Sequence, residues 1–163
     1  MGIPASLLLI ALLIATGAFF SAAEISLAAA RRLKLRQLAD DGDRRAAQVL
    51  AVQESPGHYF TAVQIGLNMV AILGGIVGEG ALTPHYSALL SLVLDAERAQ
   101  TLGFACSFMT ITGLFIVLAD LVPRRLGMND PERLAMRTVG TMLWLTALLK
   151  PVVWLFNGLS NGL

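Results

Sequence analysis

Three stretches of this sequence are long and apolar enough to cross a lipid bilayer, and each contains a polar side chain. They cover residues 3–30, 60–82 and 100–123, and each exceeds the about 20 residues that an α-helix needs to cross about 30 Å of hydrocarbon. Glu24, Asn68 and Asp120 lie within these stretches. A carboxylate in hydrocarbon is unfavourable unless it faces protein, water or a cation, so such residues are candidates for function.

The composition excludes an ordinary soluble domain, because 56% of the residues are hydrophobic and only 14% are charged. The first stretch is too long for a secretory signal and has no basic segment before it, so we expect it to be retained. A further apolar segment over 132–158 is interrupted at Lys150-Pro151, which predicts a juxtamembrane helix along the membrane surface. The sequence therefore predicts an all-α membrane protein, with residues 1–163 forming one transmembrane domain of three spans.

Basic residues predict the orientation of the spans. They are concentrated between the first two stretches and after the third, whereas Arg98 stands alone between the second and third. The two basic groups are Arg31, Arg32, Lys34, Arg36, Arg44 and Arg45, and Arg124, Arg125, Arg133 and Arg137. The positive-inside rule places both groups and the C-terminus in the cytosol and the N-terminus outside. We therefore expect a multi-pass protein of the cell's inner (plasma) membrane.

The first cytosolic segment, residues 31–54, is predicted to form a helical hairpin. Two apolar stretches flank the sequence Asp40-Asp41-Gly42-Asp43, whose residues favour a turn and a helix cap. The acidic turn could also indicate Ca²⁺, but it lacks the distal glutamate of an EF-hand loop. A solvated turn is therefore the preferred interpretation.

Any bound metal ion should be held by oxygen ligands. Cys106 is the single cysteine, and His58 and His85 lie at opposite ends of the second stretch, so a soft-metal centre is not expected. Pro123 lacks an N–H, which removes the usual donor to the carbonyl of Ala119. Helical spacing places Gly17, Ser21 and Glu24 on one face of the first predicted helix. It also places Gln64 and Asn68 on one face of the second. The predicted ligands are Gly17, Ser21, Glu24, Asn68 and Asp120.

Ser21, Glu24 and Asn68 share a depth in the predicted membrane, about 10–15 Å from the cytosolic surface at about 1.5 Å per residue, and Asp120 lies nearer the edge. Structural roles are open for several of them. Ser21 could bond its own helix, Asn68 could bridge two helices, and Asp120 could pair with Arg124. Glu24 is harder to explain in this way, because the nearest arginine on its own helix is two turns away. The set suits Mg²⁺, Ca²⁺ or Na⁺.

Glycines of the second stretch predict close helix packing. Gly74 and Gly78 have the GxxxG spacing, and Gly75 and Gly80 extend the small-residue surface. Three spans enclose little space for an ion, so we predict a homodimer packed through this surface. Glu79, near the outer end, could line an outer exit for the ion or contact lipid headgroups, and the interfacial role is the preferred interpretation.

Three motifs resemble the transmembrane module of the CorC/cyclin-M (CNNM) magnesium transporters, including the bacterial members once described as haemolysin-like. They are FFSAAEISL at 19–27, TAVQIGLNMVAILGGIVGE at 61–79 and LADLVPRRLGM at 118–128, and they occur in the family's order across nearly the whole chain. Family members usually have Glu where this chain has Asp120 and Lys where it has Arg124, and both changes keep the charge.

The resemblance implies a homodimer with three spans per protomer, a belt-like juxtamembrane helix and a Mg²⁺ site in the inner half of the membrane. It also implies cytosolic CBS domains through which ATP acts; the sequence given has no such region, so we expect it to be part of a longer protein. The expected function is Mg²⁺ export by alternating access, with Na⁺ coupling open, because the same oxygens suit Na⁺. Membrane lipid is the expected surrounding, and no nucleic-acid partner is expected.

Two other classes of function are considered. An intramembrane aspartyl or metal protease is disfavoured, because the sequence has no GxGD, HExxH or GxSxG motif, and we expect no enzymatic activity. A non-transporting Mg²⁺ sensor or scaffold that signals to cytosolic domains would use the same residues. Flux measurements, and not binding alone, would separate it from a transporter.

Overall fold

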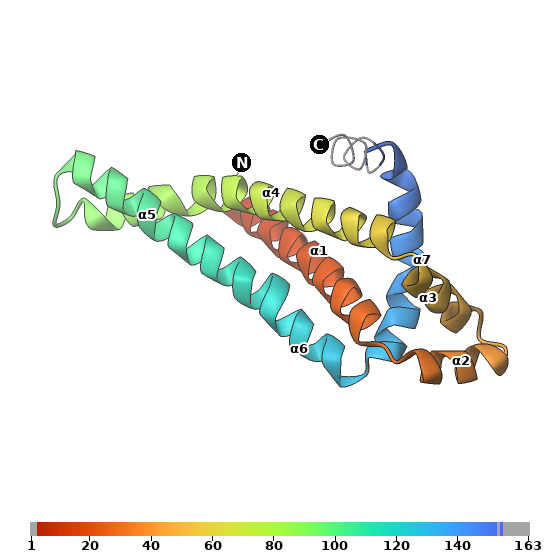
Figure 1. Ribbon diagram of the computed structural model, residues 1–163. Helices are drawn as coiled ribbons and strands as arrows, with labels where there is room; N and C mark the ends of the chain where they lie inside the picture. Colours follow the sequence, from red (N-terminus) through yellow and green to blue (C-terminus); the bar gives the residue numbers. More distant parts are fainter. Residues whose placement is uncertain (1–2, 153, 155–163) are drawn as a thin grey trace. The chain divides into compact units, whose positions relative to one another are not determined.

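The computed structural model describes all residues except 1–2, 153 and 155–163, and every element within that described part is helical (Figure 1). The elements are α1 (Ile3–Ala29), α2 (Arg32–Asp40), α3 (Arg44–Glu54), α4 (Gly57–Leu90), α5 (Ala96–Phe115), the π-helix η1 (Ile116–Leu121), α6 (Val122–Asn129) and α7 (Pro131–Leu148). The predicted all-α class is confirmed.

Three helical segments are long and apolar enough to cross a membrane: Pro4–Ala29, Gly57–Leu90 and Ala96–Asn129. The third joins α5, η1 and α6 without a break. Their mean hydropathies are 2.2, 1.8 and 2.1, and only 22–28% of each apolar window is buried inside the chain. Such apolar, outward-facing surface is stable only in lipid or against another protein surface. The chain is therefore a multi-pass membrane protein.

The chain divides into two compact units, and each span contributes residues to both. Unit 1 comprises Met1–Ala18 and Asn68–Val122, and unit 2 comprises Phe19–Leu67 and Pro123–Leu163. The units differ in how their helices pack, so each is described separately.

In unit 1, large side chains of α5 pack onto glycines of α4. The Phe115 ring lies over Gly74 and the Ile111 side chain lies over Gly78, so close that a Cβ atom at either glycine would clash. Toward the other end of the pair, Ser107 Oγ lies 3.5 Å from the carbonyl oxygen of Glu79. The small residues thus permit close approach of α4 and α5 within one chain.

This packing corrects one step of the sequence analysis. The Gly74/Gly78 pair was assigned to contact between protomers, but both glycines are covered by α5 of the same chain. A Cβ atom at Gly75 or Gly80 would meet nothing within 4 Å. GxxxG spacing identifies close packing but does not specify the partner helix, and here the neighbouring span supplies it.

Unit 2 has a conventional hydrophobic core. It is formed by one face of the helical hairpin predicted from the sequence, packed with α7 and the adjacent ends of α1 and α4. Its buried members are Phe20, Ala23, Leu27, Ala30, Leu35, Ala46, Val49, Val52, Tyr59, Val63, Ala135, Val139 and Met142. The Tyr59 hydroxyl donates to the carbonyl of Ala23 at 3.3 Å, which satisfies the polar end of a buried ring.

The predicted helical hairpin is present as α2 and α3. Gly42 adopts φ +98°, a conformation that glycine accepts readily, and Asp43 is the N-cap of α3. The Asp43 carboxylate accepts from the backbone N–H groups of Arg45 at 2.8 Å and Ala46 at 3.4 Å. The acidic turn therefore has a structural role as a helix cap.

The juxtamembrane helix predicted over 132–158 begins at Pro131 and ends at Leu148, followed by a turn at Leu149 and helical residues at 150–152. Leu149 donates its N–H to the carbonyl of Leu145. The interruption coincides with the Lys150-Pro151 pair that was expected to kink the helix. Residues 153 and 155–158 of the predicted segment lie outside the described residues.

Candidate functional site

Glu24 is a polar residue of the predicted spans that contacts side chains of two other helices. Its Oε1 accepts a hydrogen bond from Gln64 Nε2 at 3.2 Å, and its Oε2 lies 3.9 Å from Arg124 Nη2. The Glu24 side chain is 22% exposed and that of Arg124 is 43% exposed. All three residues belong to unit 2. The site is therefore a half-buried carboxylate that faces two nitrogen groups from two other helices.

This geometry corrects the reason for which Glu24 was selected. On its own helix the nearest arginine is two turns away, so the sequence alone indicates no obvious partner for this charge. The partner comes from α6, 100 residues further along the chain, and sequence spacing within one helix does not reveal it. An ion pair is thus a structural alternative for Glu24 as well.

The other predicted ligands are divided between the two units. Gly17, Asn68 and Asp120 belong to unit 1, and Ser21 belongs to unit 2 with Glu24. Ser21 is fully buried, Asp120 is partly buried and Asn68 is exposed. Assembly of all five residues into one metal site therefore stays a prediction.

Gly17 has a packing role in unit 1. A Cβ atom at this position would lie 3.0 Å from Ala119 Cβ and 3.2 Å from Val70 Cγ1, so the glycine permits α1 to approach both α4 and η1 closely. Ala119 precedes Asp120 in the chain, and Val70 follows Asn68 by two residues. The structure therefore brings Gly17 to the helix segments that carry both polar residues, whereas the predicted role of its carbonyl stays untested.

The π-helix η1 alters the backbone around Asp120. The Val122 N–H donates to the carbonyl of Val117, five residues earlier. In an α-helix it would instead donate to the carbonyl of Leu118, four residues earlier. Pro123 has no N–H to offer to Ala119. Two consecutive carbonyls, those of Leu118 and Ala119, therefore lose their α-helical donors immediately before Asp120. The sequence predicted one such carbonyl, because proline is visible in a sequence and a π-turn is not.

Within the described residues, no group of three or more His, Cys, Asp and Glu side chains is placed to hold a metal ion. The predicted set contains only two carboxylates, and its other oxygens come from a hydroxyl, an amide and backbone carbonyls. A divalent cation there would depend strongly on these neutral oxygens.

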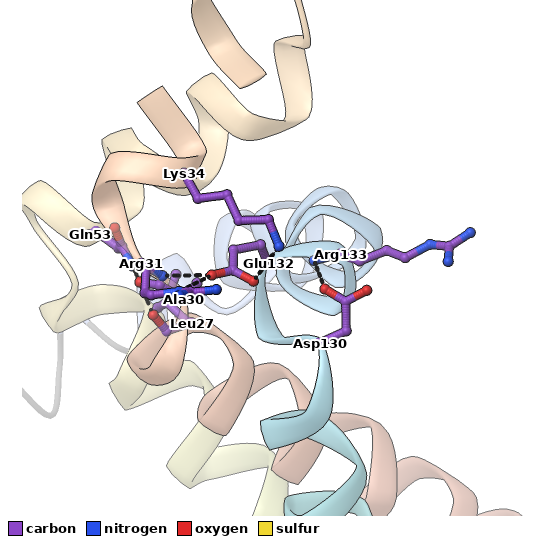
Figure 2. A network of polar contacts seen from close by, with 8 residues as sticks. All are labelled: Leu27, Ala30, Arg31, Lys34, Gln53, Asp130, Glu132 and Arg133. Atoms are coloured by element: carbon purple, nitrogen blue, oxygen red, sulfur yellow. Dashed lines mark hydrogen bonds and ion pairs between the residues drawn. The ribbon is translucent and has the colours of Figure 1, made fainter. Parts of the chain in front are cut away.

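Sequence analysis missed a buried charged residue, Glu132. Figure 2 shows its carboxylate facing Arg31 and Lys34, at 3.1 Å from Arg31 Nε and 3.1 Å from Lys34 Nζ. The side chain of Glu132 is 2% exposed, whereas those of Arg31 and Lys34 are 76% and 47% exposed. Burial raises the pKa of this carboxyl, but the hydrogen bonds from Arg31 and Lys34 outweigh that effect and lower the pKa to about 2.

Gln53 was also missed. Its Nε2 donates to the carbonyls of Leu27 at 3.0 Å and Ala30 at 2.9 Å, and its own backbone carbonyl accepts from Arg32 Nη2 at 2.7 Å. The side chain therefore satisfies carbonyls at the C-terminal end of α1 (Figure 2). Neither Glu132 nor Gln53 has a sequence signature, because their partners lie more than 20 residues away.

Known proteins resemble the chain over almost its whole length. The profile of the cyclin M transmembrane N-terminal domain matches residues 8–163. A polyamine export protein of Salmonella typhimurium is 52% identical over 158 residues, which is 97% of this chain and 35% of that protein. Those of Escherichia coli K12 and Haemophilus influenzae are 52% and 44% identical, each over 96% of this chain, with 35% and 36% of their own lengths covered.

The chain thus spans about a third of the length of these relatives. The matched residues 8–163 include all of the second and third apolar spans and most of the first. The match covers the segments that contain all three motifs noted in the sequence. The chain belongs to the cyclin M transmembrane-domain family.

Proposed function

We propose that this chain is the transmembrane module of an exporter of small organic cations of the polyamine class. The relatives named polyamine export protein, 52% identical over nearly all of this chain, support this substrate class. The module would operate in the plasma membrane with its N-terminus outside and its basic segments in the cytosol, and transport would involve no covalent chemistry.

The structural observation that carries the proposal is the surrounding of Glu24. This carboxylate of a spanning helix already faces nitrogen donors, the Gln64 amide and the Arg124 guanidinium. A primary ammonium group is bound by the same kind of acceptor. It also retains part of its hydration more easily than Mg²⁺, which requires near-octahedral oxygens at about 2.0–2.1 Å. One carboxylate with an amide neighbour suits an ammonium group better than a dehydrated divalent ion.

Mg²⁺ export by alternating access is the second candidate. The observation that favours it is the pair of carbonyls, Leu118 and Ala119, that lose their α-helical donors beside Asp120. With Asn68, which belongs to the same unit, they offer the hard neutral oxygens that Mg²⁺ prefers. The same oxygens would suit Na⁺, and coupling to a Na⁺ gradient belongs to this candidate.

We further propose that the module acts as a homodimer. With Gly74 and Gly78 covered within the chain, the surface available to a second copy lies beside them on α4 and α5. A groove of about 340 Å³ is lined there by residues that include Ile72, Gly75 and Phe108. Gly75→Leu would fill part of this groove and should weaken association, which cross-linking in the membrane would measure.

Flux in proteoliposomes tests the proposed substrate. The full-length protein that contains this module would be reconstituted, and release of labelled putrescine and of Mg²⁺ would be followed in parallel, with empty liposomes as the control. We expect protein-dependent putrescine flux. Protein-dependent Mg²⁺ flux without putrescine flux would reject the polyamine proposal in favour of the second candidate. Binding of either cation without any flux would instead indicate a sensor or scaffold.

A further inference from the structure

A pocket of about 210 Å³ lies in unit 2, where two membrane-spanning helices meet the helical hairpin. Four residues at or next to the ends of α1 and α4 form its apolar wall, and two residues of the hairpin form its polar wall. The apolar wall consists of Leu27, Ala28, Pro56 and Phe60, and the polar wall consists of Arg32 and Gln53. The pocket thus joins apolar surface from the spans to a positive charge outside them.

The guanidinium of Arg32 is held at this pocket, and its charge is not balanced by an ion pair. Its Nη2 donates to the backbone carbonyl of Gln53 at 2.7 Å, which uses one of the several N–H donors of a guanidinium. Among the described residues no carboxylate pairs with Arg32, whereas Arg31 and Lys34 both pair with Glu132. Arg32 therefore offers a positioned positive charge and further donors to an anion.

The helix ends around the pocket also favour an anion. Pro56 immediately precedes α4 and Phe60 lies near its start, so the N-terminal end of this helix, with its partial positive charge, borders the pocket. The C-terminal end of α1 has the opposite partial charge, but Gln53 Nε2 donates to two of its carbonyls (Figure 2). Glu54, the acid next to Gln53, is exposed and is not one of the lining residues.

We propose that this pocket binds the phosphate group of an anionic membrane phospholipid. The pocket is smaller than the about 300–1,000 Å³ of sites that enclose whole small molecules, so it suits a headgroup phosphate whose acyl chains remain outside. Its apolar wall, at the ends of α1 and α4, directs those chains along the spans. The positive-inside rule predicts that this end faces the cytosol, where basic pockets between spanning helices recognise anionic headgroups. The bound lipid stabilises unit 2 whatever the transported cation is.

Thermal unfolding of the full-length protein in detergent micelles tests this site. Phosphatidylglycerol should raise the melting temperature of the wild type by about 2–4 °C more than the same amount of phosphatidylcholine. Arg32→Gln should lose this difference. Arg36→Gln is the matched control and should retain it, because it removes an exposed positive charge from the same helix at a position that does not line the pocket. Millimolar glycerol 3-phosphate, which has the phosphate without acyl chains, should give less than half of the wild-type shift.

A second pair of variants tests the pocket without altering Arg32. Ala28 and Ala29 are both exposed at the end of α1, but only Ala28 lines this pocket. Ala28→Trp should fill the pocket and abolish the phosphatidylglycerol shift, whereas Ala29→Trp should retain it. This pair decides the question if Arg32→Gln does not fold.

An undiminished phosphatidylglycerol shift in folded Arg32→Gln or Ala28→Trp would overturn the inference, as would the absence of any such shift in the wild type. An equal loss in Arg36→Gln would show an effect of general charge and would also overturn it. A shift from glycerol 3-phosphate as large as that from phosphatidylglycerol would assign the pocket to a soluble phosphate and reject the lipid.

Discussion

The two units of this chain achieve close packing by different means. In unit 1, side chains of α5 lie over glycines of α4, and many large apolar residues remain exposed. In unit 2, aliphatic and aromatic side chains from five helices form a shared core, with the Glu132 ion pairs beside it. In water, burial of apolar surface stabilises the contacts between helices. In lipid this gain is largely absent, so helices there associate mainly through close packing of complementary shapes. The difference indicates that unit 1 is built for the membrane interior, and that much of unit 2 is built for its aqueous border.

The largest effect is expected from filling a glycine contact in unit 1. Gly78→Leu would place a side chain where Ile111 already lies, and overpacking of this kind should destabilise the protein by about 3 kcal/mol. Thermal unfolding in detergent would measure the loss. Gly80→Leu is the matched control, because a Cβ atom there meets nothing within 4 Å. Equal losses in both variants would show that the α4–α5 contact is not what holds unit 1 together.

A smaller effect, dependent on pH, is expected in unit 2. Glu132→Gln keeps the shape of the side chain but removes its charge from Arg31 and Lys34, which should cost about 1–3 kcal/mol at neutral pH. The folded-state pKa of about 2 lies below the ordinary value of 4.5. The contribution of this carboxylate to stability is therefore complete above pH 4.5 and is lost as the pH falls toward 2.

Melting temperatures measured between pH 7 and pH 2.5 would check this dependence. The wild type should lose more stability than Glu132→Gln below pH 4.5, so the two curves should converge in acid. Asp95→Asn provides a control, because its pair with Arg98 is exposed and 4.0 Å long and should contribute less than about 0.5 kcal/mol. Parallel curves for wild type and Glu132→Gln would contradict the assigned role of Glu132.

The smallest structural effect concerns the hairpin of unit 2. Asp43→Ala removes the carboxylate that accepts from the N-terminus of α3 and should cost about 1 kcal/mol. Asp41→Ala should be close to neutral, because the C-cap interaction of Asp41 uses its backbone N–H. Chemical or thermal unfolding of the two variants would distinguish a cap from a general effect of acidic residues. A larger loss in Asp41→Ala would overturn the assignment.

Much of the fold follows from local sequence patterns. The three spans, the hairpin and its Asp43 cap depend on apolar run length, turn residues and capping chemistry, all of which act within a few residues. Contacts between distant segments were not predictable in this way. The partner of Gly78 is Ile111 and the partners of Glu132 are Arg31 and Lys34, and no local pattern specifies either choice.

The candidate site was predicted only in part for the same reason. Glu24 is recognisable as a carboxylate in an apolar stretch, but its contact with Arg124 depends on the packing of α6. Pro123 revealed the loss of one backbone donor, whereas the loss at Leu118 depends on the π-turn. Polar residues in a membrane span can thus be identified from sequence, and their partners require the fold.

The most direct test of cation export at the Glu24 site is putrescine flux in proteoliposomes containing Glu24→Gln or Gln64→Leu in the full-length protein. Glu24→Gln removes the charge that would bind the ammonium group, and Gln64→Leu removes the amide that donates to this carboxylate at 3.2 Å. We expect each to reduce flux at least about 10-fold, the equivalent of about 1.4 kcal/mol, while the melting temperature is preserved. Wild-type flux in both correctly folded variants would contradict the account.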